Sequence, residues 1–167
     1  MTASQPLKPA VPPHATRTPA PPQEAGAWAV GTLMAMIPAL EPTAELVLST
    51  AAARAGLTRT AMADAMLTGS DGTPLPAGTD RALRHAVQAA RAPETRARTP
   101  GPSLMPLLAD AGRALGRFFD ARLRLAAAPA DAAARREFED TLFTLCVLMG
   151  RPCAHTALYE ALQYTEG

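Results

Sequence analysis

The sequence has few aromatic side chains, two cysteines and a single lysine. Aromatic residues make up 4% of the 167 residues, and much of the 48% hydrophobic content is alanine. The apolar area available for burial is therefore small, and we expect one domain or two very small ones, of modest stability. Cys146 and Cys153 are too few for a disulfide scaffold, and no export signal precedes them. A cytoplasmic protein with reduced thiols is predicted.

Strong net charge is also missing. Lysine and arginine exceed aspartate and glutamate by one, and the isoelectric point is about 7.9. The whole molecule therefore lacks the basic charge typical of a general nucleic-acid binder, and any such role must be local.

A long apolar run comes closest to a membrane span between Glu24 and Glu41. The uncharged residues 25–40 fall short of the roughly 18–20 apolar residues a spanning helix needs, and they contain Gly31 and Pro38. Acidic residues rather than arginines flank the run. A buried helix is predicted, and no membrane association.

Motifs for catalysis are absent as well. The sequence has no nucleophile elbow, no Walker loop and no dinucleotide-binding glycine motif, so we expect neither an enzyme nor a cofactor. Cys146, Cys153 and His155 could be three soft metal ligands. A structural zinc site needs a fourth ligand, and a thiol within an apolar helix packs as a small hydrophobic group, so core packing is preferred.

What is present is helical periodicity, which predicts an all-α fold without strands. Seven of the seventeen prolines fall in residues 1–23, which predicts a disordered tail. A small three-helix bundle with a linking helix is expected over 24–91, a linker over 92–102, and a C-terminal helical domain over 103–167.

Capping residues mark the ends of the first three helices. The first should end before Pro38, the second should start with Pro42 and stop at Gly56, and Thr58 is a plausible N-cap for the third. Residues 69–78 read as a turn throughout.

The linking helix is predicted from Asp80 to Arg91, and its arginines should face outward. Leu83, Val87 and Ala90 are expected to face inward, with Arg81, Arg84, His85 and Arg91 outside.

A helical hairpin and a short last helix are predicted for the C-terminal domain. The first helix should begin after Ser103, Asp131 should cap the second, and Pro152 should open the last. Residues 141–149 are apolar on every side, so we expect the centre of a second core there.

Residues 26–67 resemble the ANTAR domain, a three-helix RNA-binding module of bacterial antitermination regulators. The likeness covers A-x-G-x-L-M in the first helix and small or aliphatic positions in the next two. The residues that carry it are Ala29, Gly31, Leu33, Met34, Ala44, Leu48, Ala51, Met62, Ala63, Met66 and Leu67. The resemblance implies binding of tandem RNA hairpins through backbone phosphates and loop bases.

The glycine of this motif stands in the most apolar segment of the chain. Ala29 and Gly31 would form a shallow strip that lets another backbone or a nucleic-acid sugar edge approach closely. Alternatively, the strip only lets the second helix pack tightly.

The sequence departs from the ANTAR pattern at Gln23, Met36 and Pro38, and residues 26–67 carry a net charge of −1. Residues 79–98 carry a net charge of +3 and could supply the missing positive charge; Arg96 and Arg98 contribute to it. The candidate RNA-binding residues are Ala29, Gly31, Arg54, Arg59, Arg81, Arg84 and Arg91.

Residues 138–152 resemble the D-x-x-Y-T-L-C-V-x-T-G signature of a small helical domain of unknown function from high-GC bacteria. Phe143 stands for its tyrosine and Met149 for its threonine. The resemblance implies a fold, with an oligomerising or sensing role as a guess from architecture.

Two hypotheses for function follow. The first is a divergent ANTAR-like RNA-binding transcription antitermination regulator. The second is a non-catalytic protein-interaction or oligomerisation module that has lost RNA binding, with a homodimer or another protein as partner. This second hypothesis rests on the net negative charge of residues 26–67. It also rests on four methionines that are expected at the surface, Met34, Met36, Met62 and Met66. Exposure of Met36 together with Trp28 would favour it.

Overall fold

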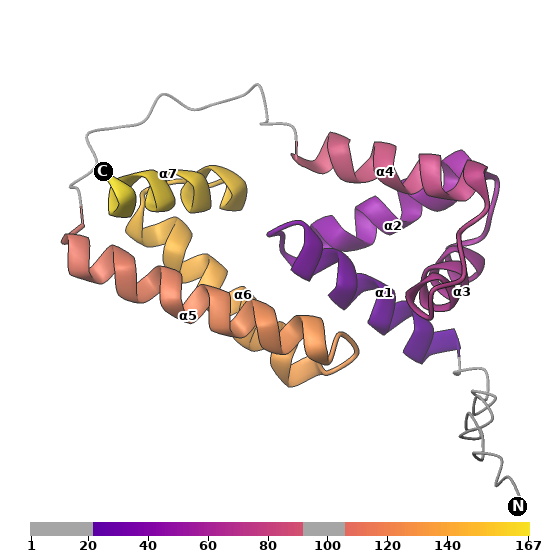
Figure 1. The fold of residues 1–167 in the computed structure, drawn as a ribbon, viewed down its shortest axis with the longest axis horizontal. Coiled ribbons are helices and arrows are strands. Elements are labelled where there is room, and N and C mark those ends of the chain that lie inside the picture. Colours follow the sequence, from indigo (N-terminus) through magenta and orange to yellow (C-terminus); the bar gives the residue numbers. More distant parts are fainter. Residues whose placement is uncertain (1–21, 92–105) are drawn as a thin grey trace, which may run out of the picture.

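The computed structural model describes residues 22–91 and 106–167, which contain α-helices, turns and no strands (Figure 1). The predicted all-α class is confirmed. The predicted tail and linker lie outside the described residues, except that Pro22 and Gln23 already belong to the first helix. The helices are α1 (Pro22–Met36), α2 (Glu41–Ala55), α3 (Arg59–Ser70), α4 (Ala77–Arg91), α5 (Leu108–Ala127), α6 (Ala132–Leu148) and α7 (Ala154–Glu166).

Local capping sets several helix ends where the sequence predicts them. Pro42 lies in the first turn of α2, and Gly56 closes that helix with a left-handed φ of 68°. The Thr58 side chain accepts a hydrogen bond from the backbone N–H of Ala61, and the Asp131 side chain accepts one from Ala133. Each cap satisfies a backbone donor or acceptor that the helix leaves free.

Three other boundaries differ from the prediction. The turn over 69–78 is shorter, because α3 continues to Ser70 and α4 already begins at Ala77. A side chain at Gly69 would contact Leu75, so the turn folds back against the end of α3. The last helix begins at Ala154 after the N-cap Cys153, not at Pro152.

The start of α5 also differs. It begins at Leu108, whereas the sequence predicts a start after Ser103, and residues 103–105 lie outside the described residues. Pro106 lacks a backbone N–H and disfavours helical geometry in the residue before it, which explains the later start.

The helices form two modules, which Figure 1 shows side by side. In the N-terminal module (22–91), α1 packs on α2 and α3, and α4 packs on α2. In the C-terminal module (106–167), α5 packs on α6 and α7, and α6 packs on α7. Helix α1 also contacts α5, so the modules share one continuous hydrophobic core.

The core of the C-terminal module differs from the prediction for residues 141–149. Leu142, Leu145 and Met149 are buried on one side of α6 beneath α5 and α7. Phe143 and Val147 point to the other side and are 65% and 64% exposed. The expected second core centre is therefore confirmed for one face of this helix end only, because neighbouring helices leave the other face exposed.

Candidate functional site

Gly31 and Ala29 of α1 lie beneath other parts of the protein. Ala29 is fully buried, and Gly31 is buried as well. A Cβ atom at Gly31 would overlap the carbonyl oxygen of Pro129 and lie 2.7 Å from its carbonyl carbon. Pro129 belongs to the turn between α5 and α6. The close approach that the glycine permits is therefore made by backbone from the C-terminal module, not by α2.

Polar contacts hold the same turn of α1 and the start of α2 against the C-terminal module. Arg122 of α5 donates from Nε to the carbonyl oxygen of Ala35, at 2.7 Å. The backbone N–H of Glu41 donates to Oε1 of Glu139 on α6, at 2.8 Å. Both groups stand at helix ends, where backbone donors and acceptors have no partner within the helix.

An ion pair completes this junction. Arg135 of α6 donates from Nη1 to the Glu41 carboxylate at 3.0 Å, and its side chain is 15% exposed. Partial burial reduces the screening of this pair by water and salt, but Nε of the same arginine is buried with no hydrogen-bond partner among the described residues, which opposes the gain. We call these contacts, together with the Gly31–Pro129 packing, the module junction.

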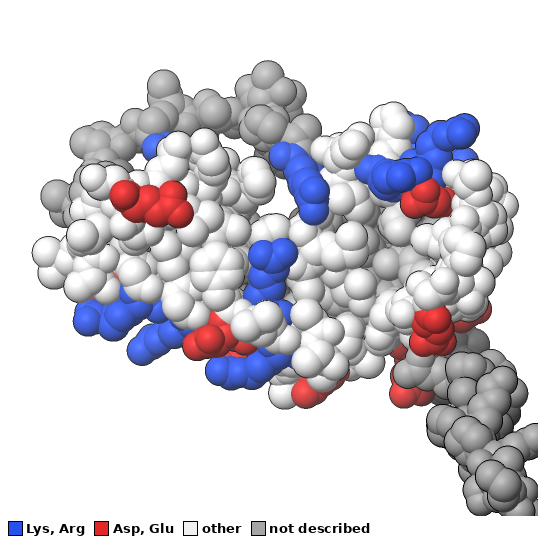
Figure 2. Space-filling model, viewed as in Figure 1, with Lys and Arg blue, Asp and Glu red and all other residues white. Residues whose placement is uncertain are grey.

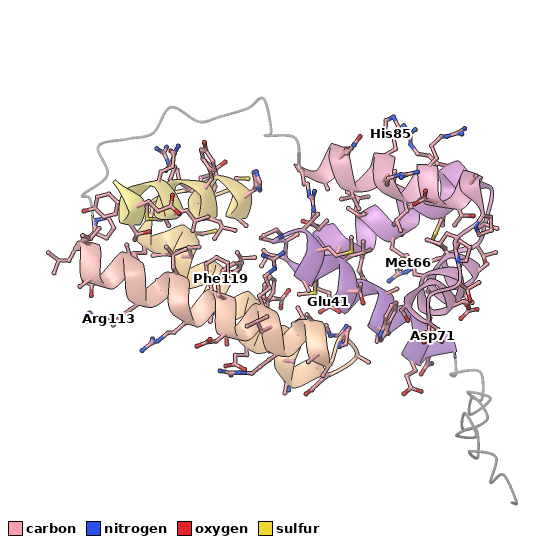
Figure 3. All side chains as sticks on the ribbon, in the orientation of Figure 1. Glu41, Met66, Asp71, His85, Arg113 and Phe119 are labelled. Atoms are coloured by element: carbon pink, nitrogen blue, oxygen red, sulfur yellow. The ribbon has the colours of Figure 1, made fainter. Side chains whose placement is uncertain are left out.

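The outer face of α4 is basic. Arg81, Arg84, His85 and Arg91 are exposed, and Figure 2 shows lysine or arginine side chains over this helix. His85 points away from the core in Figure 3. Arg84 forms an ion pair with Asp80, whereas Arg81 forms none with any described residue. We call this surface the α4 basic face.

The buried side of α4 is made of small residues. The predicted inward position of Ala90 is wrong, since that residue is exposed, and Leu83 is half-buried. The side chains buried against the bundle are Thr79, Ala82, Ala86 and Val87.

The structure separates the remaining predicted arginines. Arg54 is exposed in the last turn of α2. Because α2 and α4 lie antiparallel (Figure 1), this turn is near the start of α4. Arg59 instead pairs with Glu45 at 2.8 Å, in a polar pocket that Arg135 also lines. Neither arginine lies on α4, so neither belongs to the α4 basic face.

A second arginine joins the C-terminal end of α1 beside Arg122. Arg91 of α4 donates from Nη2 to the carbonyl oxygen of Met36, at 3.1 Å. Two helices from different modules thereby place guanidinium groups on consecutive carbonyls. Sequence reasoning missed Arg122, because α1 and α5 are far apart along the chain and no local motif marks their contact.

The two cysteines are free thiols, each half-buried. Burial, and to a lesser degree the neighbouring Cys153, raises the pKa of the Cys146 thiol above its ordinary value. The thiolate is the metal-binding and nucleophilic form, so Cys146 is less reactive than a free cysteine. Among the residues that the structure describes, no group of three or more His, Cys, Asp or Glu could hold a metal ion. No described helix is long and apolar enough to cross a membrane.

The methionines do not form the predicted exposed surface. Met34, Met62 and Met66 are buried, and only Met36 is exposed, at 45%. Trp28 is half-buried and packs against the core. Met62 and Met66 are buried residues of α3, which packs on α1 and α2.

A different apolar surface lies between α2 and α6. A groove of about 560 Å³ is lined by the apolar residues Leu40, Pro42 and Phe143. Four carboxylates surround it, from Glu41, Glu45, Glu139 and Asp140. We call this surface the acidic groove.

One comparison with known proteins gives a match. Residues 103–166 match a family described as protein of unknown function (DUF5133). No curated protein and no solved structure matches the chain. The resemblance of the C-terminal residues to a helical domain of unknown function is confirmed, and the resemblance of residues 26–67 to the ANTAR domain stays a prediction.

Proposed function

We propose that this protein is a divergent ANTAR-like regulator that binds structured RNA, with the α4 basic face as its contact surface. The observation that carries the proposal is the row of exposed Arg81, Arg84 and Arg91 on one side of α4, with His85 between them. Phosphate contacts provide most of the affinity in such complexes, and they need exposed cations along a surface.

The α1 strip has a different role in this proposal. Both residues are buried, and the α5–α6 turn packs directly on Gly31, so in this proposal neither Ala29 nor Gly31 contacts RNA. The ANTAR resemblance implies RNA as the ligand. The proposed contact surface lies on α4, outside the residues 26–67 that carry the resemblance.

The test is a titration of the purified protein with an RNA carrying two tandem hairpins, at two salt concentrations. Replacing Arg81, Arg84 and Arg91 with alanine should weaken binding by about 100-fold at low salt and flatten its salt dependence. The matched control replaces Arg117, Arg124 and Arg136, which are exposed in the C-terminal module, and removes the same charge. Equal losses in both triple variants would show only a general charge effect and sink the assignment to α4.

A second candidate function is a protein-interaction module, favoured by the acidic groove. Phe143 is 65% exposed beside the groove, and Val147 follows one helical turn later with 64% exposure. Exposed apolar side chains at helical spacing, rimmed by charge, are typical of partner surfaces.

Native mass spectrometry of protein purified without nuclease separates the two functions. Retained RNA that is lost in the α4 triple variant would support the first. A dimer that Phe143→Ser abolishes, with no retained nucleic acid, would support the second. A free monomer that binds no hairpin RNA would contradict the first function and self-association in the second.

A further inference from the structure

Arg91 and Arg122 come from different modules and meet at one helix end. Arg91 donates to the carbonyl oxygen of Met36, and Arg122 donates to that of Ala35. Consecutive carbonyls at the C-terminus of a helix point the same way along its axis, so both guanidinium groups reach the same end of α1, one from α4 and one from α5.

The positive charge of this pair is poorly balanced. In the described ranges, neither arginine forms an ion pair with a carboxylate. Six others do, namely Arg59, Arg84, Arg113, Arg124, Arg135 and Arg151. The C-terminus of a helix carries only about half a negative charge. Two full positive charges therefore remain largely uncompensated, and each repels the other.

Free donors remain on both side chains. A guanidinium group has five N–H donors, and Arg91 and Arg122 each use one of them in the contacts with α1. Arg91 is exposed and Arg122 is half-buried, so the remaining donors face a surface that solvent reaches. Forked donors of this kind match the oxygens of a phosphate group.

We propose that Arg91 and Arg122 together bind one phosphodiester group of an RNA that lies along the α4 basic face. This inference rests on the proposed RNA binding and adds a contact from the C-terminal module. Arg81, Arg84, Gln88 and Arg91 follow one another at spacings of three, four and three on one side of α4. The row is about 15 Å long, and Arg122 continues it across the module junction.

The arrangement couples RNA binding to the docking of the modules. A phosphate held by both arginines neutralises their mutual repulsion and adds a bridge between α4 and α5. RNA should therefore raise the thermal stability of the junction, since a ligand stabilises the state to which it binds.

The test compares Arg91→Ala, Arg122→Ala, the double variant and the control Arg117→Ala in titrations with tandem-hairpin RNA over a range of salt. Arg117 lies on α5, as Arg122 does, is exposed and has no ion pair with a described residue. Arg91→Ala and Arg122→Ala should each weaken RNA binding about 5- to 10-fold. Each should also make the dependence of the binding constant on salt shallower, by the amount expected for about one phosphate contact. The double variant should also lose about one contact, because both arginines serve one phosphate.

Arg122→Gln separates RNA binding from a structural role. Glutamine keeps an N–H donor for Ala35 and removes the charge. We expect RNA affinity to fall as in Arg122→Ala, with thermal unfolding of the free protein close to wild type. An RNA affinity equal to that of Arg117→Ala, or a double variant that loses two contacts, would overturn the shared phosphate and leave the α4 basic face intact. Wild-type protein that binds no RNA would overturn the proposed function and this inference together.

Discussion

Glycines within α1 and α5 have opposite surroundings. A Cβ atom at Gly31 would overlap backbone of Pro129, whereas one at Gly112 or Gly116 would meet nothing within 4 Å. Glycine weakens a helix by about 1 kcal/mol relative to alanine in all three places. Among these three positions, only at Gly31 does close packing of another segment compensate for this loss, so Gly31 is a docking position and the glycines of α5 are open surface.

The comparison shows how the modules are assembled. The module junction uses a close backbone approach at Gly31 and polar contacts at the two helix ends that follow it. A backbone segment cannot adjust by changing a side-chain rotamer, so the packing at Gly31 leaves little room for change.

The largest effect is expected for Gly31→Ala. The added methyl group must displace Pro129, and such overpacking should lower the free energy of unfolding by about 3 kcal/mol. Chemical denaturation measures the loss. Amide hydrogen exchange of residues 29–36 should also increase, because displacement of the α5–α6 turn uncovers α1.

Gly26→Ala is the matched control for Gly31→Ala. Gly26 lies on the same helix, and a Cβ atom there would meet nothing within 4 Å. We expect no loss of stability. A Gly31→Ala variant as stable as Gly26→Ala would show that the turn does not press on α1.

A smaller loss is expected for Glu139→Ala. Its carboxylate accepts the hydrogen bond from the Glu41 backbone N–H, and removal leaves this donor without that partner. The free energy of unfolding should fall by about 1–2 kcal/mol. Glu139→Gln keeps an acceptor and should lose less, and thermal unfolding of both variants measures the difference. Equal losses would show that charge, not the hydrogen bond, is what Glu139 supplies.

A gain in stability is expected from a substitution at Thr32, the neighbour of Gly31. Its hydroxyl oxygen is buried and has no hydrogen-bond partner among the described residues. Thr32→Val keeps the shape of the side chain and removes the unsatisfied group, so stability should rise by about 1 kcal/mol. Thr32→Ser keeps the hydroxyl and should show no gain in denaturant unfolding. A destabilised valine variant would mean that the hydroxyl has a partner after all.

What the sequence predicts well is local. Thr58 and Asp131 bond backbone groups two or three residues away, so the residue type and its position are sufficient. The spacing of the buried residues in α6 is also predicted correctly, because helical periodicity is a local property of the sequence. Residues 141–149 mislead because an apolar side chain indicates burial only if another element covers it, and none of the described elements covers Phe143.

The junction could not be predicted, because its partners are distant in sequence. A glycine in an apolar helix indicates that something approaches, and nothing in residues 128–131 marks that turn as the segment that does so. Arg122 looks like any surface arginine of an amphipathic helix until the end of α1 is placed beside it. Contacts between modules depend on the tertiary arrangement, which periodicity does not encode.

The smallest expected effect is at the open glycines of α5. Gly116→Ala adds a methyl group that meets no neighbouring atom and restricts the unfolded chain, so the free energy of unfolding should rise by about 0.5 kcal/mol. Gly112→Ala should give a gain of similar size, and the two gains should nearly add, because two methyl groups about 5–6 Å apart on one helix are too far apart for van der Waals contact. Thermal unfolding of both single variants and the double variant measures this. A loss at Gly116, opposite in sign to the expectation, would show that a partner occupies this face of α5 in solution, as Pro129 occupies the face of α1 at Gly31.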